Sequence, residues 1–219
     1  MELREVTAGY GGADVVKGIS LRFQPGEVTV LAGPNGCGKS TLLRAAARLL
    51  PLSGGQVLVD GADTAGWSSR TFARQAALLP QSRPMPEITV EALVLHGRFP
   101  YLGYPRRYGP ADRAAARSAM ERAGVLELAE RNVARLSGGQ RQKVYLAMAL
   151  AQDTPVLLLD EPTTFLDIGC QLELARLMRE TAAEGKAVVM VLHDLNLALG
   201  CAHRVAVMEE GRLRAWGTP

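Results

Sequence analysis

The stretch Gly33-Pro34-Asn35-Gly36-Cys37-Gly38-Lys39-Ser40-Thr41 has the pattern GxxxxGKS, extended by one threonine. It lies between an apolar run, residues 28–32, and a helical pattern over residues 42–50. A strand, a glycine-rich turn and a helix in this order are the setting of a phosphate-binding P-loop. The glycines let backbone N–H groups point inward, and the helix presents the positive end of its dipole to a polyphosphate. The stretch therefore predicts an α/β core that binds a nucleoside triphosphate.

Two side chains of this loop, those of Lys39 and Ser40, are expected to bind different parts of the nucleotide complex. Lys39 is expected to reach the β- and γ-phosphates, and Ser40 is expected to hold Mg²⁺. Glycine-rich turns also occur in ordinary strand-to-helix connections, but a full match in this context favours the phosphate site. We therefore expect the whole stretch 33–41 to contact the nucleoside triphosphate.

A second motif, Leu136-Ser137-Gly138-Gly139-Gln140, precedes a helical run that extends to residue 150. Ser137 with Gln140 three residues later is a capping box, which by itself only starts a helix. Two consecutive glycines weaken the first turn and leave bare N–H groups that suit an anion. Together with the P-loop, the motif resembles the signature of the ABC ATPases. That resemblance implies that Ser137, Gly138, Gly139 and Gln140 contact the ATP that a partner subunit holds.

Asp160 and Glu161 end an apolar run, residues 155–159. This is expected of a buried parallel strand that delivers acidic residues to the carboxyl edge of its sheet. An acidic pair after a strand is also a common start of a turn or helix. The resemblance to ABC ATPases implies that Asp160 holds Mg²⁺ and that Glu161 polarises the attacking water.

His193 and Gln81 each follow a strand-like apolar run, residues 187–192 and 76–80. Alone, His193 would be a structural histidine and Gln81 an ordinary loop glutamine. The resemblance implies that His193 is a switch histidine contacting the γ-phosphate and Glu161. It also implies that Gln81 senses Mg²⁺ and connects to a transport subunit.

Tyr10 and Asp167 are identified by their positions in the same resemblance. Tyr10 lies in the glycine-rich stretch 9–12 and resembles the aromatic residue on which adenine stacks, a contact that tolerates any base. The alternative is a tyrosine that only ends a strand. Asp167 resembles the loop residue that joins two nucleotide sites across a dimer.

Composition agrees with a folded globular chain. Of 219 residues, 47% are hydrophobic and 21% charged, so disorder is excluded. The net charge of +3 is too small to imply nucleic-acid binding. No apolar stretch approaches the roughly 18 to 20 residues needed to cross a bilayer, and residues 1–4 begin a strand rather than a signal peptide. We therefore expect a cytoplasmic protein, and three cysteines, an odd number, that stay free thiols.

The alternation of patterns predicts a single domain over residues 1–219. Its fold is expected to be α/β, a P-loop NTPase with a parallel-strand core, an amino-terminal antiparallel β portion and an α-helical insert. Residues 1–81 and 136–219 form the core and β portion, and about 82–135 the helical subdomain. Gly54-Gly55 is expected to be a turn. The other expected elements are strands at 56–60, 76–81, 156–160 and 187–192, helices at 89–98, 112–123, 126–131 and 168–184, and a hairpin through 209–211.

The resemblance to ABC ATPases covers the whole chain. A narrower resemblance, to the ATPase subunits of ferric siderophore, haem and vitamin B12 importers, is carried by segments 162–168, 171–174 and 191–196. It implies ATP with Mg²⁺, a homodimer in the closed state, two transmembrane permease subunits and, indirectly, an extracytoplasmic substrate-binding protein. It places the chain peripherally at the cytoplasmic face of the membrane.

The alternative is a soluble ABC-class ATPase acting on nucleic acid or ribosomes. Such proteins usually carry two cassettes, a long coiled coil or zinc-binding cysteine pairs, and this sequence has none of them. The sequence does not identify the transported solute, because the other subunits of an importer contact it.

Overall fold

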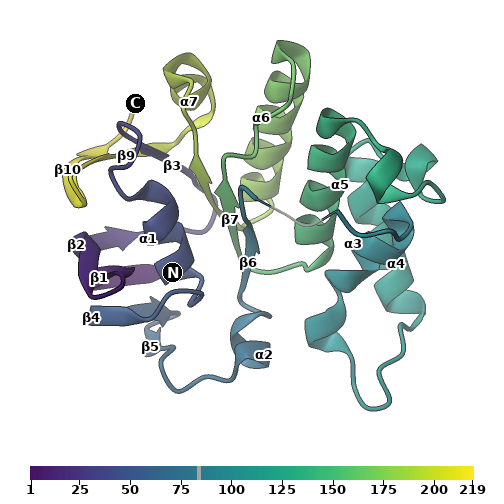
Figure 1. Cartoon of the computed structure of the whole chain (residues 1–219), viewed down its shortest axis with the longest axis horizontal. Coiled ribbons are helices and arrows are strands. Elements are labelled where there is room, and N and C mark those ends of the chain that lie inside the picture. Colours follow the sequence, from purple (N-terminus) through teal and green to yellow (C-terminus); the bar gives the residue numbers. More distant parts are fainter. Residues whose placement is uncertain (83–84) are drawn as a thin grey trace.

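Parallel strands form the centre of the molecule. The computed structural model describes residues 1–82 and 85–219. Its larger sheet has the strand order β10-β9-β3-β8-β7-β6, parallel throughout except for β10, which pairs antiparallel with β9 (Figure 1). Its strands are β3 (Val28–Ala32), β6 (Ala76–Leu79), β7 (Val156–Asp160), β8 (Ala187–Val191), β9 (Arg204–Glu209) and β10 (Arg212–Gly217).

The central strands β3, β7 and β8 are buried at every position and almost entirely apolar, because both faces of the sheet are covered. In β7, Leu157 and Leu159 belong to one hydrophobic cluster, whereas Val156 and Leu158 belong to the other. This alternation follows from side chains that point to opposite faces at successive residues. The expected strand at 156–160 is confirmed with the same bounds, and those at 76–81 and 187–192 are confirmed with ends two residues and one residue earlier.

Helices cover the two faces of this sheet. The P-loop helix α1 (Lys39–Ala46) packs in the cluster shared with the smaller sheet. On the other face lie α6 (Ile168–Ala183) and α7 (Leu195–Cys201), whose buried residues belong to the first cluster. Figure 1 shows both at the top of the molecule. Glycine at 185 ends the α6 segment in a left-handed conformation, φ 92°, so the expected helix 168–184 is confirmed.

The amino-terminal region forms a separate antiparallel sheet in the order β2-β1-β4-β5. Its strands are β1 (Glu2–Tyr10), β2 (Ala13–Arg22), β4 (Leu52–Val59) and β5 (Ala62–Asp63). The prediction of a turn at Gly54-Gly55 is wrong, because both glycines lie inside β4. Gly55 has φ 76°, and a Cβ there would lie 2.3 Å from the carbonyl oxygen of Glu5. The pair of glycines thus accommodates a close, irregular pairing with β1.

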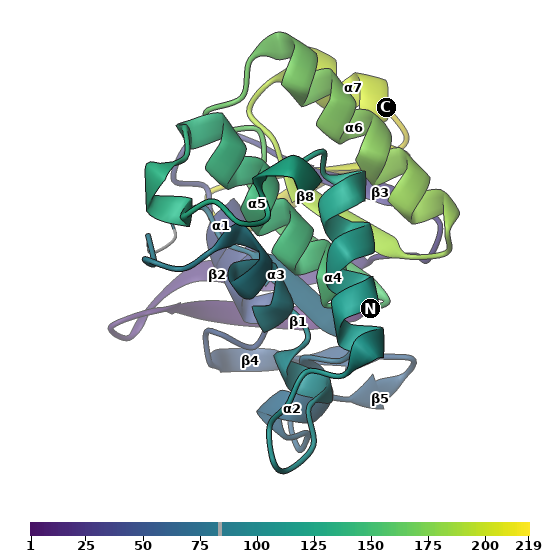
Figure 2. The same ribbon diagram turned by 90° about the vertical axis from the view of Figure 1, so that its right-hand side faces the viewer.

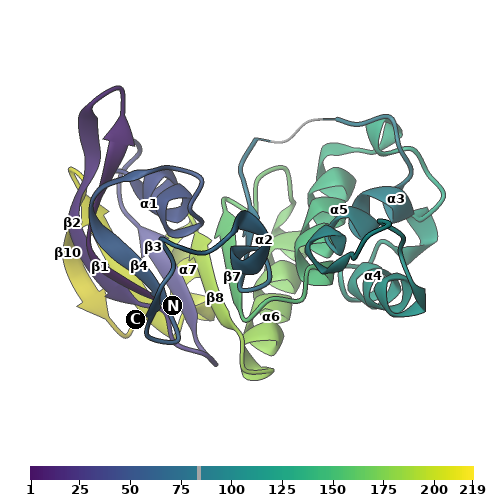
Figure 3. The same cartoon turned by 90° about the horizontal axis from the view of Figure 1, so that it is seen from below.

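A group of helices lies between β6 and β7 in the sequence. It comprises α3 (Val90–His96), α4 (Pro110–Arg122) and α5 (Gly138–Ala151), which pack on one another. Figure 2 shows α3 and α4 against α5, and in Figure 3 this group lies at the opposite end of the molecule from β1, β2 and β4. The predicted helix at 126–131 is reduced to a 3₁₀ turn, Leu126–Leu128. The division of the chain into core and subdomain stays a prediction.

Short elements complete the chain. They are α2 (Ser69–Phe72) and the 3₁₀ segments Phe99–Tyr101 and Val133–Arg135. No helix in residues 1–82 or 85–219 combines the length and the apolar character that crossing a bilayer requires. All three cysteines are free thiols, as expected.

Candidate active site

The P-loop connects β3 to α1 at the carboxyl edge of the parallel sheet. Gly33 has φ 141°, and a Cβ on it would lie 2.1 Å from the carbonyl oxygen of Met208. Gly36 and Gly38 also have positive φ, 77° and 105°. These positions require glycine, because other residues rarely adopt such backbone conformations. The loop lines a cavity of about 150 Å³ together with Val15, Glu161 and His193.

Lys39 is buried inside the loop that precedes it. Its Nζ donates hydrogen bonds to the carbonyl oxygens of Gly33 and Pro34, each at 2.8 Å, and lies 3.8 Å from the sulfur of Cys37. Only 5% of the residue is exposed. The ammonium group therefore spans the curled backbone and adds positive charge to a cavity already lined by helix-terminal N–H groups. Its predicted contact with phosphates stays a prediction.

Ser40 and Asp160 meet across the edge of the sheet. The hydroxyl of Ser40 donates to Asp160 Oδ1 at 2.7 Å. Asp160 is 1% exposed, and its burial raises the pKa of the carboxyl above the ordinary value, an effect that the Ser40 hydrogen bond opposes. A cation at these two oxygens would offset the cost of burying the charge. Hydroxyl and carboxylate oxygens are also the ligands that Mg²⁺ prefers.

Glu161 is held by two side chains from neighbouring strands. His193 Nε2 lies 2.6 Å from Glu161 Oε1, and Gln81 Nε2 donates to Glu161 Oε2 at 2.6 Å. Gln81 follows β6, Glu161 follows β7 and His193 follows β8, and these three strands are adjacent in the sheet. Parallel strands end at the same edge, so residues distant in sequence meet there. The structure thus brings together three of the predicted site residues.

Glu161 has an unusual backbone conformation, with φ 50°. A left-handed conformation costs a non-glycine residue about 1–2 kcal/mol, and such strain persists where surrounding contacts hold it and is common at functional sites. The turn directs the carboxylate toward the P-loop cavity, which Glu161 lines.

The signature motif lies away from this cavity. Ser137 caps α5 by accepting from the N–H of Gln140 at 3.2 Å, and Gln140 Oε1 accepts from the N–H of Ser137 at 3.1 Å. The capping box is therefore real. Residues 137–140 do not contribute to the lining of the P-loop cavity among the described residues. Their predicted contact with the ATP of a partner subunit stays a prediction.

Gly138 and Gly139 also have a packing role that their sequence did not indicate. A Cβ on Gly138 would lie 3.3 Å from the Cβ of Phe165, and one on Gly139 would lie 3.3 Å from the carbonyl oxygen of Phe165. Phe165 has φ 67° and is 77% exposed. The two glycines thus allow the loop between β7 and α6 to approach the start of α5.

Asp167 caps α6, where its Oδ1 accepts from the N–H of Cys170 at 2.8 Å. That backbone hydrogen bond lowers the pKa of the carboxyl. Its predicted role across a dimer stays a prediction.

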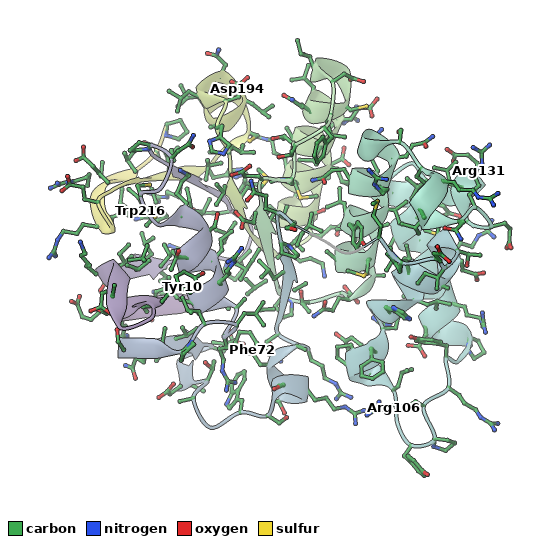
Figure 4. The ribbon with its side chains drawn as sticks, viewed as in Figure 1. Tyr10, Phe72, Arg106, Arg131, Asp194 and Trp216 are labelled. Atoms are coloured by element: carbon green, nitrogen blue, oxygen red, sulfur yellow. The ribbon has the colours of Figure 1, made fainter. Side chains whose placement is uncertain are left out.

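Tyr10 lies beside α1 and is not part of the cavity lining. Its hydroxyl accepts from Arg44 Nη1 at 3.1 Å, and the side chain is half exposed at the end of β1 (Figure 4). Stacking of adenine on this ring stays a prediction.

Two residues of the site were not expected from the sequence. Val15 lines the cavity, and its carbonyl oxygen lies 3.3 Å from the Cβ position of Gly38. Gln142, one turn into α5, is 4% exposed and donates to the carbonyl of Pro162. A buried glutamine has no sequence signal of its own, because its neighbours Arg141 and Lys143 read as an ordinary polar helix face.

Comparison with known proteins identifies the family. A family model described as ABC transporter matches residues 16–164. The chain is 46% identical to the achromobactin transport ATP-binding protein of Dickeya dadantii, over 99% of this chain and 81% of that protein. It is 46% identical to the hemin import ATP-binding protein of Streptomyces coelicolor, over 95% and 74%. It is 42% identical to the ferric enterobactin transport ATP-binding protein of Escherichia coli, over 98% and 80%.

A solved structure supports the same assignment. A dimeric ATP-binding cassette in a post-hydrolysis state, bound to ADP and Pi, matches with a TM-score of 0.87 and 28% identity over 99% of this chain and 97% of that one. The chain therefore belongs to the ABC transporter family, as one of its ATP-hydrolysing subunits. The predicted fold, a P-loop NTPase with an antiparallel β portion, is confirmed.

Proposed function

We propose that this chain is the energy-coupling subunit of a membrane importer, in which ATP hydrolysis drives separate membrane-spanning subunits. The observation that carries the hydrolytic part of the proposal is the pair of 2.6 Å contacts that hold Glu161 between His193 and Gln81. This arrangement fixes a carboxylate beside the expected position of the γ-phosphate. The importer part is supported by the similar transport and import ATP-binding proteins.

Hydrolysis would use these side chains as follows. Loop N–H groups and Lys39 bind the phosphates, and the Glu161 carboxylate accepts a hydrogen bond from water and orients it toward the γ-phosphorus. The water oxygen bonds to the γ-phosphorus while the bond between that phosphorus and the oxygen that bridges it to the β-phosphorus breaks. The products are ADP and inorganic phosphate. His193 and Gln81 keep the carboxylate aimed, so its orientation costs little at the moment of reaction.

Ser40 and Asp160 are the residues that would hold Mg²⁺, with the amide oxygen of Gln81 as a further ligand. When bound, the ion neutralises charge on the phosphate oxygens. Among the described residues, no group of three or more His, Cys, Asp or Glu side chains could hold a metal by itself. A site built from one hydroxyl, one carboxylate, one amide oxygen and the phosphates agrees with the usual mode of Mg²⁺ binding.

A second copy of the chain would complete each site. Residues 137–140 do not line the P-loop cavity of their own chain, which supports this view, as does the dimeric state of the similar solved cassette. In a head-to-tail pair, Ser137 and the N–H groups of Gly138 and Gly139 would close over the γ-phosphate of the other subunit. Two shared sites make a closed homodimer the active state.

The remaining partners follow from the importer relatives. Two permease subunits would hold the pair at the cytoplasmic face of the membrane, with an extracytoplasmic binding protein acting indirectly. Met85, Phe99 and Tyr104, which are exposed, lie in the stretch 82–107 where we expect the permease to dock; residues 83 and 84 lie outside the described residues. The relatives named for hemin and ferric enterobactin favour a ferric siderophore, haem or cobalamin-type solute.

The alternative, a soluble ABC ATPase acting on nucleic acid or ribosomes, is tested by one experiment. The tagged chain is isolated from mildly detergent-solubilised cells of its own source, and retained proteins are identified by mass spectrometry. An integral membrane protein retained in stoichiometric amount supports the importer. Ribosomal proteins or RNA in its place would overturn it.

A further inference from the structure

Gln142 is a buried polar side chain that the hydrolysis scheme above does not use. It lies on α5, four residues after Gly138 and therefore one helical turn from it, and is 4% exposed. Its Nε2 donates to the backbone carbonyl of Pro162 and lies 3.5 Å from that of Glu161. Both carbonyls belong to the loop that carries the proposed catalytic carboxylate.

That loop depends on support from outside, because it contains two non-glycine residues with positive φ, Glu161 at 50° and Phe165 at 67°. Such conformations persist only where neighbouring contacts fix them. Within the loop, the N–H of Thr164 donates to the carbonyl of Glu161 at 3.3 Å, a long hydrogen bond. Gln142 adds a side-chain donor at the residue where the unusual turn begins.

A second contact joins the same loop to the same helix. Phe165 packs over the start of α5, 3.3 Å from the Cβ position of Gly138, and its carbonyl oxygen lies 3.3 Å from that of Gly139. The loop therefore touches α5 at both ends, through Gln142 near Glu161 and through the two glycines near Phe165. Direct contacts therefore join the first turns of α5 to the loop that begins at Glu161.

We propose that Gln142 is a positioning residue for hydrolysis: it holds the carbonyls of Glu161 and Pro162 so that the carboxylate faces His193 and Gln81. It acts through Glu161 and touches no reacting atom. This inference rests on the proposed function, since it requires Glu161 to orient the water. It also means that a shift of the start of α5 would move the carboxylate within the same chain.

The test replaces the amide without changing the volume of the side chain. Gln142→Met keeps the packing but removes the donor, so kcat should fall about tenfold, the rate equivalent of one hydrogen bond to a backbone carbonyl. KM for ATP should change less than about twofold, because the loop 33–41 that binds the phosphates is untouched. A lower kcat with an unchanged KM separates positioning from general damage.

Gln152→Met is the matched control. Gln152 lies at the other end of α5, and its Nε2 also donates to two backbone carbonyls, those of Ala73 and Ala76, at 2.7 and 3.2 Å. Gln152→Met should lower the melting temperature at least as much as Gln142→Met does, while kcat should stay within about twofold of the parent value. An equal loss of kcat in both variants would overturn the proposal, because loosening α5 anywhere would then suffice.

Two further variants keep the result decisive. Gln142→Glu places a carboxyl against the two carbonyls, where burial raises its pKa and only the protonated form can donate. Its kcat relative to the parent should therefore rise as the pH falls from about 8 to about 6. In the Glu161→Gln background, Gln142→Met should cause no further loss, because the two residues act as one unit.

The outcomes separate this inference from the proposed function. Normal hydrolysis by Glu161→Gln would overturn the proposed function, and the inference with it. An inactive Glu161→Gln together with a fully active Gln142→Met would overturn the inference alone. A Gln142→Glu variant without any recovery at low pH, combined with a multiplicative loss in the double variant, would likewise contradict it.

Discussion

The Nε2 atom of His193 lies 2.6 Å from Oε1 of Glu161, although the two residues follow different strands. Adjacent parallel strands carry their last residues to one edge, so β7 and β8 deliver a carboxylate and an imidazole to the same point. Gln81, from β6, occupies the other oxygen of the carboxylate. The P-loop arrives at the same edge from β3. This convergence supports the proposal that the nucleotide is hydrolysed, and not only bound, at this edge.

The first prediction concerns the carboxylate itself. Glu161→Gln preserves shape but removes the charge that orients water, so turnover should fall by roughly 10²-fold or more. The affinity for Mg-ATP, measured with a fluorescent analogue, should stay close to that of the parent. Near-normal steady-state hydrolysis by this variant would contradict the assignment.

A second prediction concerns Asp160 and pH. Its pKa in the folded chain is raised by burial, so between the ordinary value of 3.8 and the raised value the folded state binds more protons than the unfolded state. The stability contributed by this group therefore falls as the pH rises through that window. Without nucleotide at neutral pH, Asp160→Asn should melt about 2–4 °C higher than the parent, the shift that about 1 kcal/mol gives in a chain of this size.

The same pair of proteins provides the control for this pH effect. As the pH falls through the raised pKa toward the ordinary value of 3.8, the advantage of Asp160→Asn should shrink, because the carboxyl of the parent then takes up a proton. Mg-ATP should raise the melting temperature of the parent more than that of the variant. A variant that is less stable than the parent at neutral pH would show that burial of Asp160 carries no electrostatic cost.

A third prediction concerns Cys37, which is 4% exposed and lies 3.8 Å from Nζ of Lys39. A small alkylating reagent that reaches this sulfur would fill the space around the Lys39 ammonium and should block hydrolysis. Mg-ATP should slow the reaction at Cys37, whereas labelling of the partly exposed Cys170 should not change. Peptide-level mass spectrometry measures both rates in one sample, and a Cys37 rate that is insensitive to ATP would mean that the thiol does not face the phosphates.

Much of the fold was predictable from the sequence, because its strongest patterns are local. Continuous apolar runs such as residues 155–159 identify strands buried on both faces, and the glycine pattern of the P-loop identifies the turn. The positions of Gln81, Glu161 and His193 after such runs then predict a shared edge. Gly54-Gly55 was misassigned because glycines that mark a turn and glycines that relieve a close strand pairing look the same in sequence.

Other parts of the site depend on contacts between distant segments. Gln142 is polar and lies among polar neighbours, and only the fold brings it beneath the loop after β7. The packing of Phe165 on Gly138 is similarly invisible until α5 and that loop are placed together. Ser137 and Tyr10 lie outside the P-loop cavity, so their predicted contacts with ATP require a second chain or a bound nucleotide.

The shared site between two chains is the central claim, and sedimentation velocity of the Glu161→Gln protein tests it most directly. With Mg-ATP this variant should form a dimer, because the closed state assembles and cannot hydrolyse the bound ATP. Without nucleotide it should be a monomer. Adding Ser137→Arg should return it to the monomer in both conditions, since the bulky cation occupies the place of the partner's γ-phosphate. A monomer under every condition, with hydrolysis fully retained when Ser137→Arg is made in the parent, would contradict the account.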